Sequence, residues 1–264
     1  MDQRERAIDI AFEELTTDLI ISWSQTEQES LRSNLSEILQ QAFPIMPATD
    51  REEFLVRFFR KPSEGTSRKV ILVKDKSGNL FAVSLFDHAR VRYDDKLMEA
   101  VYLNLRAVVP DYQSLAIGQG IALRVLMNLQ PDILMTTCTQ SSSLHSWIRL
   151  QGTGLIEGFE VFPQIEQQGQ RHLVVHLPYK ELPLVVSLFE QMYFQIVNCD
   201  AERVAEAMGN LTVRMVRRDV HHGMYDFHPW ERRGRMDPVA QALGLTEKDG
   251  VLVVFKKLRE ADRR

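Results

Sequence analysis

The sequence predicts an α+β fold in which helices flank a mixed, mostly antiparallel sheet. Apolar residues recur at helical spacing in the segment before residue 60. Two extended, β-branched runs then lie on either side of the turn signal Ser77-Gly78-Asn79, as in a β-hairpin. Between residues 97 and 129 a long strand, a loop of small residues and an amphipathic helix follow one another. Together these three patterns favour a central sheet with helices packed on it.

The segment before the hairpin is predicted to hold three helices. Residues 4–22 place apolar side chains on one helical face. A second such pattern runs from Leu31 to Ala42, and Pro44 ends it. Asp50 is suited to cap a third, short helix.

The remaining patterns alternate between strands and helices. One helix is expected at 121–129, and another carries Trp147 and is capped from Ser141, Ser142 or Ser143. The expected strands are 69–73, 80–91, 97–109, 133–137, 155–162 and 172–177.

Pro178 and Pro183 indicate a domain boundary. We expect one domain over 1–177 and a small α+β subdomain over 178–264 that shapes the acceptor side of the site. The second unit carries predicted helices at 201–208 and 237–243 and predicted strands at 211–220 and 251–255.

Composition narrows the class of protein. The chain has 264 residues, a net charge of −4 and a pI of about 6.0, which disfavours nucleic acid as a partner. Its two cysteines, Cys138 and Cys199, lie far apart without metal-ligand spacing, as expected in a reducing compartment. The charged start of the sequence resembles neither a signal peptide nor a membrane span. We therefore expect a cytoplasmic protein that does not bind membranes.

The segment with the clearest chemistry runs from Val108 to Gly120. The small residues Ala116, Gly118 and Gly120 let a ligand approach the backbone closely. The helix that follows begins with amides that lack partners within the helix, and its dipole favours negative charge there. A strand, loop and helix start of this kind suits a pyrophosphate.

This segment resembles motif A of the Gcn5-related N-acetyltransferase (GNAT) superfamily. Val108 matches the valine that ends the family's strand, and Gln113 matches its Gln/Arg position. Ala116 stands where the first glycine of the motif usually lies, and Gly118 matches its last small residue. The order of predicted elements over about 20–177 is also similar to the family's topology. The resemblance implies a GNAT-like sheet, to which 178–264 adds the small extension.

The resemblance implies acetyl-CoA or another acyl-CoA as cofactor. The backbone near Val108 and Val109 would bind the pantetheine and polarise the acyl carbonyl, and amides from Gln113 to Gly118 would hold the pyrophosphate. The cofactor-binding residues implied are Val108, Val109, Gln113, Ser114, Leu115, Ala116, Ile117, Gly118, Gln119 and Ser142.

The family's second signature is only partly present. Ser141 or Ser142 stands near its asparagine, and Trp147-Ile148 stands where a tyrosine would protonate the leaving thiolate. Tryptophan and isoleucine cannot supply that proton usefully. His145 is therefore the candidate general acid.

Three residues on the predicted strands are candidates for the general base that deprotonates the amine. Glu99 is the first choice, and Asp87 and His88 are the alternatives. Strand alternation allows at most one of Asp87 and His88 to face a cleft. Each of the three is also a plausible surface residue, and water-mediated deprotonation would need none of them.

Three other groups are interpreted without catalytic roles. No metal is expected, because the spacing of His221, His222, His228 and Asp226 matches no familiar site. The arginines at 232, 233 and 235 fit a solvated loop. Cys138 fits a small core residue rather than a nucleophile.

The function predicted is acyl transfer, most simply acetyl transfer, from coenzyme A to an amine by direct attack. The acceptor would be a small molecule or a peptide, and a homodimer stays open. The alternative is a catalytically silent GNAT-like protein that binds acyl-CoA or a partner in a regulatory role. A longer acyl chain on a carrier protein is a third option for the donor.

Overall fold

A mixed sheet runs through the computed structural model, which describes residues 10–62, 64–93, 95–138, 140–150, 153–162, 164–168, 172–176, 214–216, 230–232, 234–245 and 249–258. The described sheet has eight strands, seven of them in the order β1-β2-β3-β4-β5-β12-β6, with β9 paired to β12. All neighbours are antiparallel except β4 and β5, which are parallel. The predicted mixed, mostly antiparallel sheet is thus confirmed.

The strands of this sheet are β1 (Ala11–Thr16), β2 (Thr66–Lys74), β3 (Leu80–Tyr93), β4 (Lys96–Val108), β5 (Ile133–Cys138), β6 (Phe159–Phe162), β9 (Arg214–Val216) and β12 (Asp249–Lys257). Two short hairpins lie outside it. One joins β7 (Gln164–Gln168) to β8 (His172–His176), and the other joins β10 (Glu231–Arg232) to β11 (Arg235–Met236).

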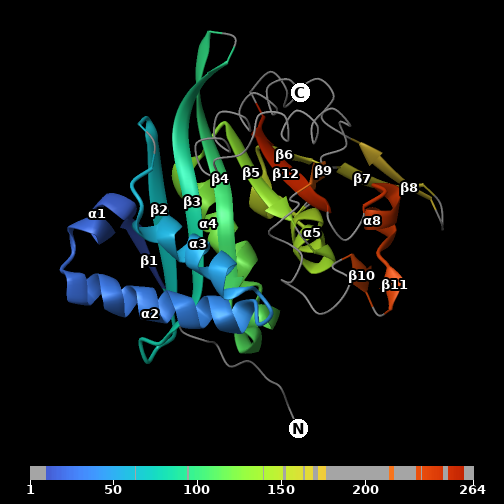
Figure 1. Ribbon diagram of the computed structural model, residues 1–264. Coiled ribbons are helices and arrows are strands. Elements are labelled where there is room, and N and C mark those ends of the chain that lie inside the picture. The colour runs from blue at the N-terminus through green and yellow to red at the C-terminus, as the bar shows by residue number, and fades with distance from the viewer. Residues whose placement is uncertain are drawn as a thin grey trace.

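Helices cover both faces of the sheet. One face carries α1 (Thr17–Ser22), α2 (Gln25–Ala42) and α3 (Ala48–Phe59), and the other carries α4 (Ile117–Leu129), α5 (Ser141–Ile148) and α8 (Pro238–Ala242). Figure 1 shows α2 and α3 in front of strands β2 to β4 and α4 behind them. Two 3₁₀ helices, η1 (Pro110–Leu115) and η2 (Gly154–Ile156), complete the described elements.

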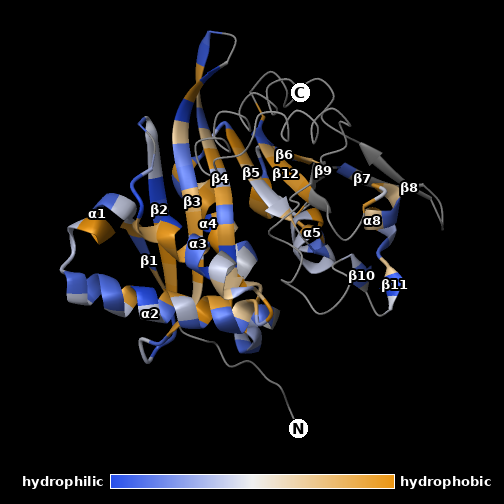
Figure 2. Cartoon of the chain, in the orientation of Figure 1, coloured by the Kyte–Doolittle hydropathy of each residue, from blue (hydrophilic) through white to orange (hydrophobic). Residues whose placement is uncertain are grey.

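The two helical layers produce two apolar cores. On the α2–α3 face, Leu35 and Phe58 pack with strand residues such as Val83. On the α4–α5 face, Ile121 and Trp147 pack with another set of strand residues. Figure 2 shows hydrophobic colour on the strands between the helices, whereas the tip of the β3–β4 hairpin is hydrophilic.

The predicted helix at 4–22 is wrong over most of its described part. Residues 11–16 form β1, which pairs antiparallel with β2, Phe12 opposite Val73 and Leu15 opposite Val70. The sheet edge supplies hydrogen bonds and apolar neighbours that outweigh the helical spacing. The helix begins only at Thr17, where the Thr16 hydroxyl accepts a hydrogen bond from the Leu19 amide.

The other predicted helices that fall within the described residues are confirmed, with shifted starts. A capping box between Ser24 and Glu27 opens α2. Asp50 does not cap α3, since Pro47 occupies the N-cap position and Asp50 lies inside the helix. The start of α4 is Ile117, so Gly118 lies in its first turn rather than in a loop. None of the described helices is long and apolar enough to cross a membrane.

The predicted boundary near Pro178 and the predicted helix at 201–208 lie outside the described residues, so both stay predictions. However, β12 lies between β5 and β6 in the main sheet. The segment after 178 is therefore not wholly a separate subdomain, because its strand β12 (249–257) is part of the main sheet.

Replacing Phe255 tests how much β12 contributes to the core. Phe255 is fully buried, and its ring lies 5.1 Å from that of Trp147 in an edge-to-face arrangement. Phe255→Ala should lower the free energy of unfolding by about 3–5 kcal/mol. The control is Leu97→Ala, at a side chain 63% exposed, which should stay within about 0.5 kcal/mol of the parent in urea unfolding. Equal stability of the two variants would contradict the central position of β12.

Candidate functional site

The parallel strands β4 and β5 separate partway along their length. They pair only from Ala100–Ile133 to Leu103–Thr136, although β4 continues to Val108. The reason lies in a β-bulge, since Leu85 pairs with Leu105 and Phe86 with Leu103, leaving Asn104 without an opposite residue. A bulge bends its strand. The second half of β4 therefore leaves β5, and a gap opens between them.

The edge of β4 that faces this gap carries unpaired peptide groups. Ala107 pairs with Val83 on β3, and the Val109 amide donates to the Phe81 carbonyl at 3.0 Å. Peptide groups alternate along an antiparallel strand, so those of Arg106 and Val108 point away from β3. In the described part of the chain, no strand pairs with them. The Val108 carbonyl accepts a hydrogen bond of 3.0 Å from the Gln113 side chain.

The chain passes from β4 through η1 into α4 with one unusual backbone conformation. Ala116 has φ 56° and ψ 25°, in the left-handed region where glycine is the usual residue. The motif's preference for glycine at this position therefore has a conformational cause. The Ala116 carbonyl accepts from the amides of Gln119 and Gly120 at 3.0 Å each. Ile117 and Gly118 stand in the first turn of α4, where amides have no acceptor within the helix, and this position is suited to an anion.

A strand that leads through a short loop into a helix start is the arrangement that the resemblance to motif A implies. The fold is GNAT-like. Several solved acetyltransferases show weak structural similarity to this chain. A histone acetyltransferase HPA2-related acetyltransferase from Corynebacterium glutamicum is 13% identical, with a TM-score of 0.38 over 62% of this chain and 93% of that one.

A putative GNAT-family acetyltransferase from Desulfovibrio desulfuricans is 10% identical, with a TM-score of 0.39 over 60% of this chain and 88% of that one. Aminoglycoside N-acetyltransferase AAC(6')-Iy, solved in complex with CoA, is 10% identical, with a TM-score of 0.37 over 56% and 89%. No family model matches the chain, and no curated protein matches it. At such identities and TM-scores these likenesses carry no information about individual residues.

The predicted cofactor residues lie along one continuous path, except for Ser142. Leu115 is exposed at the end of η1, which also contains Ser114, whereas the Ile117 side chain is buried in the core. The Gln119 side chain donates to the Ser146 carbonyl at 2.5 Å and so joins α4 to α5. Ser142 is exposed in the first turn of α5.

Arg106 joins the same two helices across the gap. Its Nη1 donates to the Gly118 carbonyl at 3.2 Å, and its Nη2 donates to the Ser143 hydroxyl at 3.3 Å. The guanidinium lies 4.3 Å from the ring centroid of Trp147. Desolvation lowers the pKa of Arg106. The sequence analysis did not single out Arg106. The feature that could have indicated it is an arginine placed among the apolar residues of a predicted strand.

His145 does not face the gap. Its Nε2 lies 2.7 Å from a carboxylate oxygen of Asp237, which also accepts from the Ser141 hydroxyl at 2.6 Å. At about 100° per helical residue, Ser141 and His145 share one side of α5, while Ser143 and Trp147 share the other. The candidate general acid is thus on the opposite side of α5 from Arg106.

Asp237 is a second residue that the sequence did not single out. It is buried, and its other oxygen accepts from the Val239 amide at 2.9 Å, which caps α8. Burial raises the pKa of Asp237, but hydrogen bonds from Ser141 and His145 outweigh it and hold the pKa below its ordinary value. The contacts among Ser141, His145 and Asp237 thus connect α8 to α5.

Glu99 lies at the other end of β4 from the helix start. Nine residues of strand separate it from Val108, which is about 30 Å at 3.3 Å per residue. Its carboxylate bonds to His88 at 2.5 Å and to Arg90 at 2.6 Å. Partial burial raises the pKa of Glu99, but these partners outweigh it and lower the pKa overall. Glu99 and His145 are not brought together.

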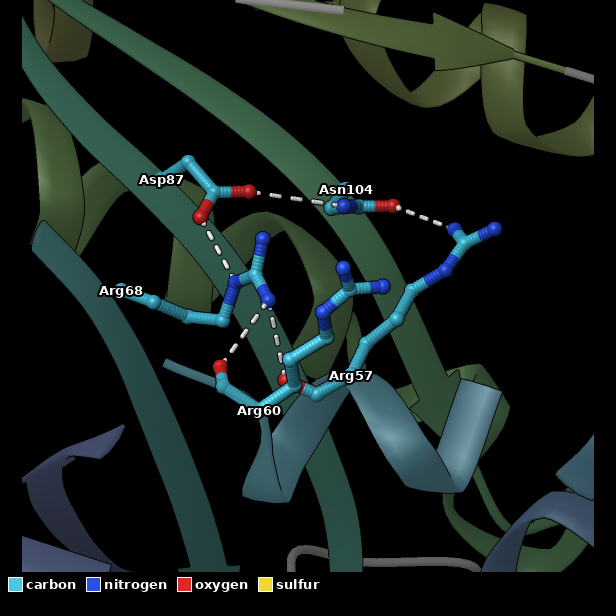
Figure 3. Close-up of polar contacts among 5 residues, drawn as sticks. All are labelled: Arg57, Arg60, Arg68, Asp87 and Asn104. Carbon is cyan, nitrogen blue, oxygen red and sulfur yellow. Dashed lines mark hydrogen bonds and ion pairs between the residues drawn. The ribbon is translucent and has the colours of Figure 1, made fainter. Parts of the chain in front are cut away.

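Asp87 lies inside, on the face covered by α3, while His88 points to the other face, as strand alternation predicts. Figure 3 shows Asp87 facing Arg68 and Asn104, with Arg57 beyond. Arg68 Nε donates to Asp87 at 2.7 Å, and the Asn104 amide donates to its second oxygen at 3.4 Å. Burial raises the pKa of Asp87 against the lowering effect of Arg68.

The same network anchors α3. Arg68 Nη1 also donates to the carbonyls of Arg57 and Arg60, at 3.1 and 3.4 Å, where α3 ends. Since Asp87 is fully buried and already ion-paired, we interpret it as a structural residue beside the bulge. Asp87 on β3 is therefore not available as the general base.

A groove with a volume of about 810 Å³ lies on the other side of the predicted cofactor segment. It runs between α2 and the β2–β3 turn and reaches Val109, Asp111 and Tyr112. Its carboxylates outnumber its single lysine, Lys74, and they are Glu13, Glu27, Glu37, Asp75 and Asp111. Such a lining favours a cationic ligand.

The described residues contain no cluster of three or more metal-ligating side chains. The histidines at 221, 222 and 228, with Asp226, lie outside the described residues. Cys138 is buried at the end of β5, and burial raises the pKa of its thiol to about 11. It therefore remains a thiol at neutral pH, which fits the predicted core residue.

The protonation of Cys138 can be tested with a thiol reagent. With Cys199 replaced by serine, a pKa of about 11 leaves about 0.1% thiolate at pH 8, against about a quarter for a free cysteine. Folded protein should react with Ellman's reagent at least 100-fold more slowly than protein in guanidinium, because only the thiolate attacks. Comparable rates would show an accessible, reactive Cys138.

Asp87→Ala should lower the free energy of unfolding by about 3–5 kcal/mol, because it leaves Arg68 buried without its partner. The double change Asp87→Leu with Arg68→Met should recover much of this loss, since the charges disappear together. Glu99→Ala removes a partly exposed ion pair and should cost about 1 kcal/mol or less. Urea unfolding measures all three, and a cost for Asp87→Ala no greater than for Glu99→Ala would contradict the structural role.

Proposed function

We propose that the protein binds an acyl-CoA in the gap between β4 and β5 and transfers the acyl group to an amine. The observation that carries this proposal is the edge of β4 at Arg106 and Val108, which β5 does not cover, next to the start of α4. An acyl-CoA joins a peptide-like pantetheine arm to a pyrophosphate. The edge suits the first, and the helix start suits the second.

The residues present fit such a ligand without relying on particular side chains. Backbone groups of Arg106 and Val108 would hold the pantetheine amides as a neighbouring strand would. The amides at the start of α4 would bind the pyrophosphate, aided by the helix dipole. When bound, the ligand supplies an acyl group activated as a thioester. A fixed peptide N–H aimed at its carbonyl would stabilise negative charge that develops there.

The acceptor would approach from the acidic groove. This groove borders Val109 and Tyr112 on the α2 side, and its carboxylates would attract a protonated amine. The amine must lose a proton before it attacks. Since Glu99 and His145 lie away from the gap, we propose that water carries this proton rather than a dedicated side chain.

A catalytically silent protein that keeps the ligand is the second candidate. The same placement of Glu99 and His145 favours it. Release of free thiol from acetyl-CoA in the presence of a panel of amines separates the two candidates, because only the transferase accelerates that release.

Coenzyme A should raise the melting temperature. A ligand at 100 times its dissociation constant stabilises the folded state by about 2.7 kcal/mol. Gly118→Val should weaken this effect, since a side chain there meets the Arg106 guanidinium 3.6 Å from Cβ and crowds the helix start. The control is Gly120→Val, where a Cβ meets nothing within 4 Å. Absence of any shift at millimolar coenzyme A, with the protein folded, would exclude the proposed site.

A further inference from the structure

The proposed site has two parts that lie on two different elements. The edge of β4 at Arg106 and Val108 would hold the pantetheine arm, and the start of α4 would hold the pyrophosphate. Between the two parts the chain passes through η1 and the left-handed backbone of Ala116. A ligand that reaches both parts gains from both only if their separation and orientation are fixed beforehand.

Arg106 belongs to both parts. Its backbone lies in the edge of β4, and its Nη1 donates to the Gly118 carbonyl at 3.2 Å, in the first turn of α4. A carbonyl inside an α-helix already accepts from the amide four residues later, so the guanidinium uses the second lone pair of the oxygen. The bond is therefore not needed to form the helix, and it orients the helix start from the side of β4.

The start of α4 has no side-chain cap of its own, because its N-cap residue is Ala116. The contact from Arg106 thus supplies an anchor that the local sequence does not provide. Neighbouring groups hold the half-buried guanidinium in place for this contact. Its Nη2 donates to the Ser143 hydroxyl at 3.3 Å, and its centre lies 4.3 Å from the ring centroid of the fully buried Trp147. A planar fork fixed by two bonds and a ring has little freedom to rotate.

We propose that Arg106 is a positioning residue that fixes the start of α4 relative to the edge of β4, so that one ligand can occupy both parts of the site. This inference rests on the proposed function, and it requires no contact between the guanidinium and the ligand. The loss of Arg106 should weaken a ligand that spans both parts, whereas a fragment that occupies only one part should bind as before.

The test measures dissociation constants of the full chain by titration calorimetry for coenzyme A, pantetheine and ADP. Coenzyme A contains both a pantetheine arm and a diphosphate, and each of the other two compounds contains only one of them. Arg106→Met removes both hydrogen bonds and keeps an apolar stem next to Trp147. It should weaken coenzyme A by about 10- to 100-fold, as the loss of residues that orient metal ligands does in metal sites. The affinities for pantetheine and ADP should change by no more than about threefold.

Arg106→Lys separates orientation from charge. Lysine keeps the positive charge, but its single ammonium cannot reproduce the fork that joins Gly118 to Ser143. This variant should therefore lose affinity for coenzyme A as Arg106→Met does. The matched control is Arg124→Gln, at an exposed arginine of α4 whose guanidinium also lies over an aromatic ring, that of Phe12 at 5.3 Å. The control should keep the affinity of the parent for coenzyme A.

The outcomes separate this inference from the proposed function. Failure of coenzyme A to bind the unmodified protein overturns the proposed function and the inference with it. Unchanged affinity for coenzyme A in either folded Arg106 variant overturns only the inference, and in Arg106→Lys it would show that charge alone suffices. Equal losses for coenzyme A and ADP overturn it too, because the guanidinium would then bind the phosphates directly. If Arg106→Met does not fold, or neither fragment binds the parent, the affinity of Arg106→Lys for coenzyme A decides.

Discussion

The β-bulge at Asn104 is the constraint on which the arrangement of the site depends. Before it, Val101 and Leu103 face the core under α4, whereas after it Leu105 and Ala107 face the core under α2 and α3. One extra residue thus exchanges the two faces of the strand. Arg106 reaches α4 and α5 only because of this exchange, and the same bend opens the space next to β5.

The bulge is held from the α3 face by polar contacts. The Asn104 side chain donates to Asp87 and accepts from Arg57, both at 3.4 Å. Asp87 in turn binds Arg68, which reaches the carbonyls at the end of α3. The residue that opens the gap on one side of the sheet is therefore connected on the other side to the packing of a helix. This connection explains why an ion pair that adds little net stability can still fix a backbone irregularity.

Much of the fold could be predicted from the sequence, because the hairpin, α2, α4 and α5 follow strong local patterns. The failures have physical causes. The apolar pattern within residues 11–16 fits either a helix or an edge strand, and only pairing with β2 makes this segment a strand. The alternation of Val101, Leu103, Leu105 and Ala107 is unbroken in the sequence, so the bulge left no sign. For the site, motif A located the helix start, whereas Arg106 and Asp237 depend on contacts between distant segments that no local pattern records.

The position of β12 has a consequence for how the protein is made. β5 ends at Cys138, yet its antiparallel neighbour begins at Asp249, so more than a hundred residues of synthesis separate the two. Until β12 leaves the ribosome, β5 presents an unsatisfied edge next to apolar surface, the kind of edge that joins other strands indiscriminately. The sheet therefore closes late and through a contact of large sequence separation, which makes folding slow.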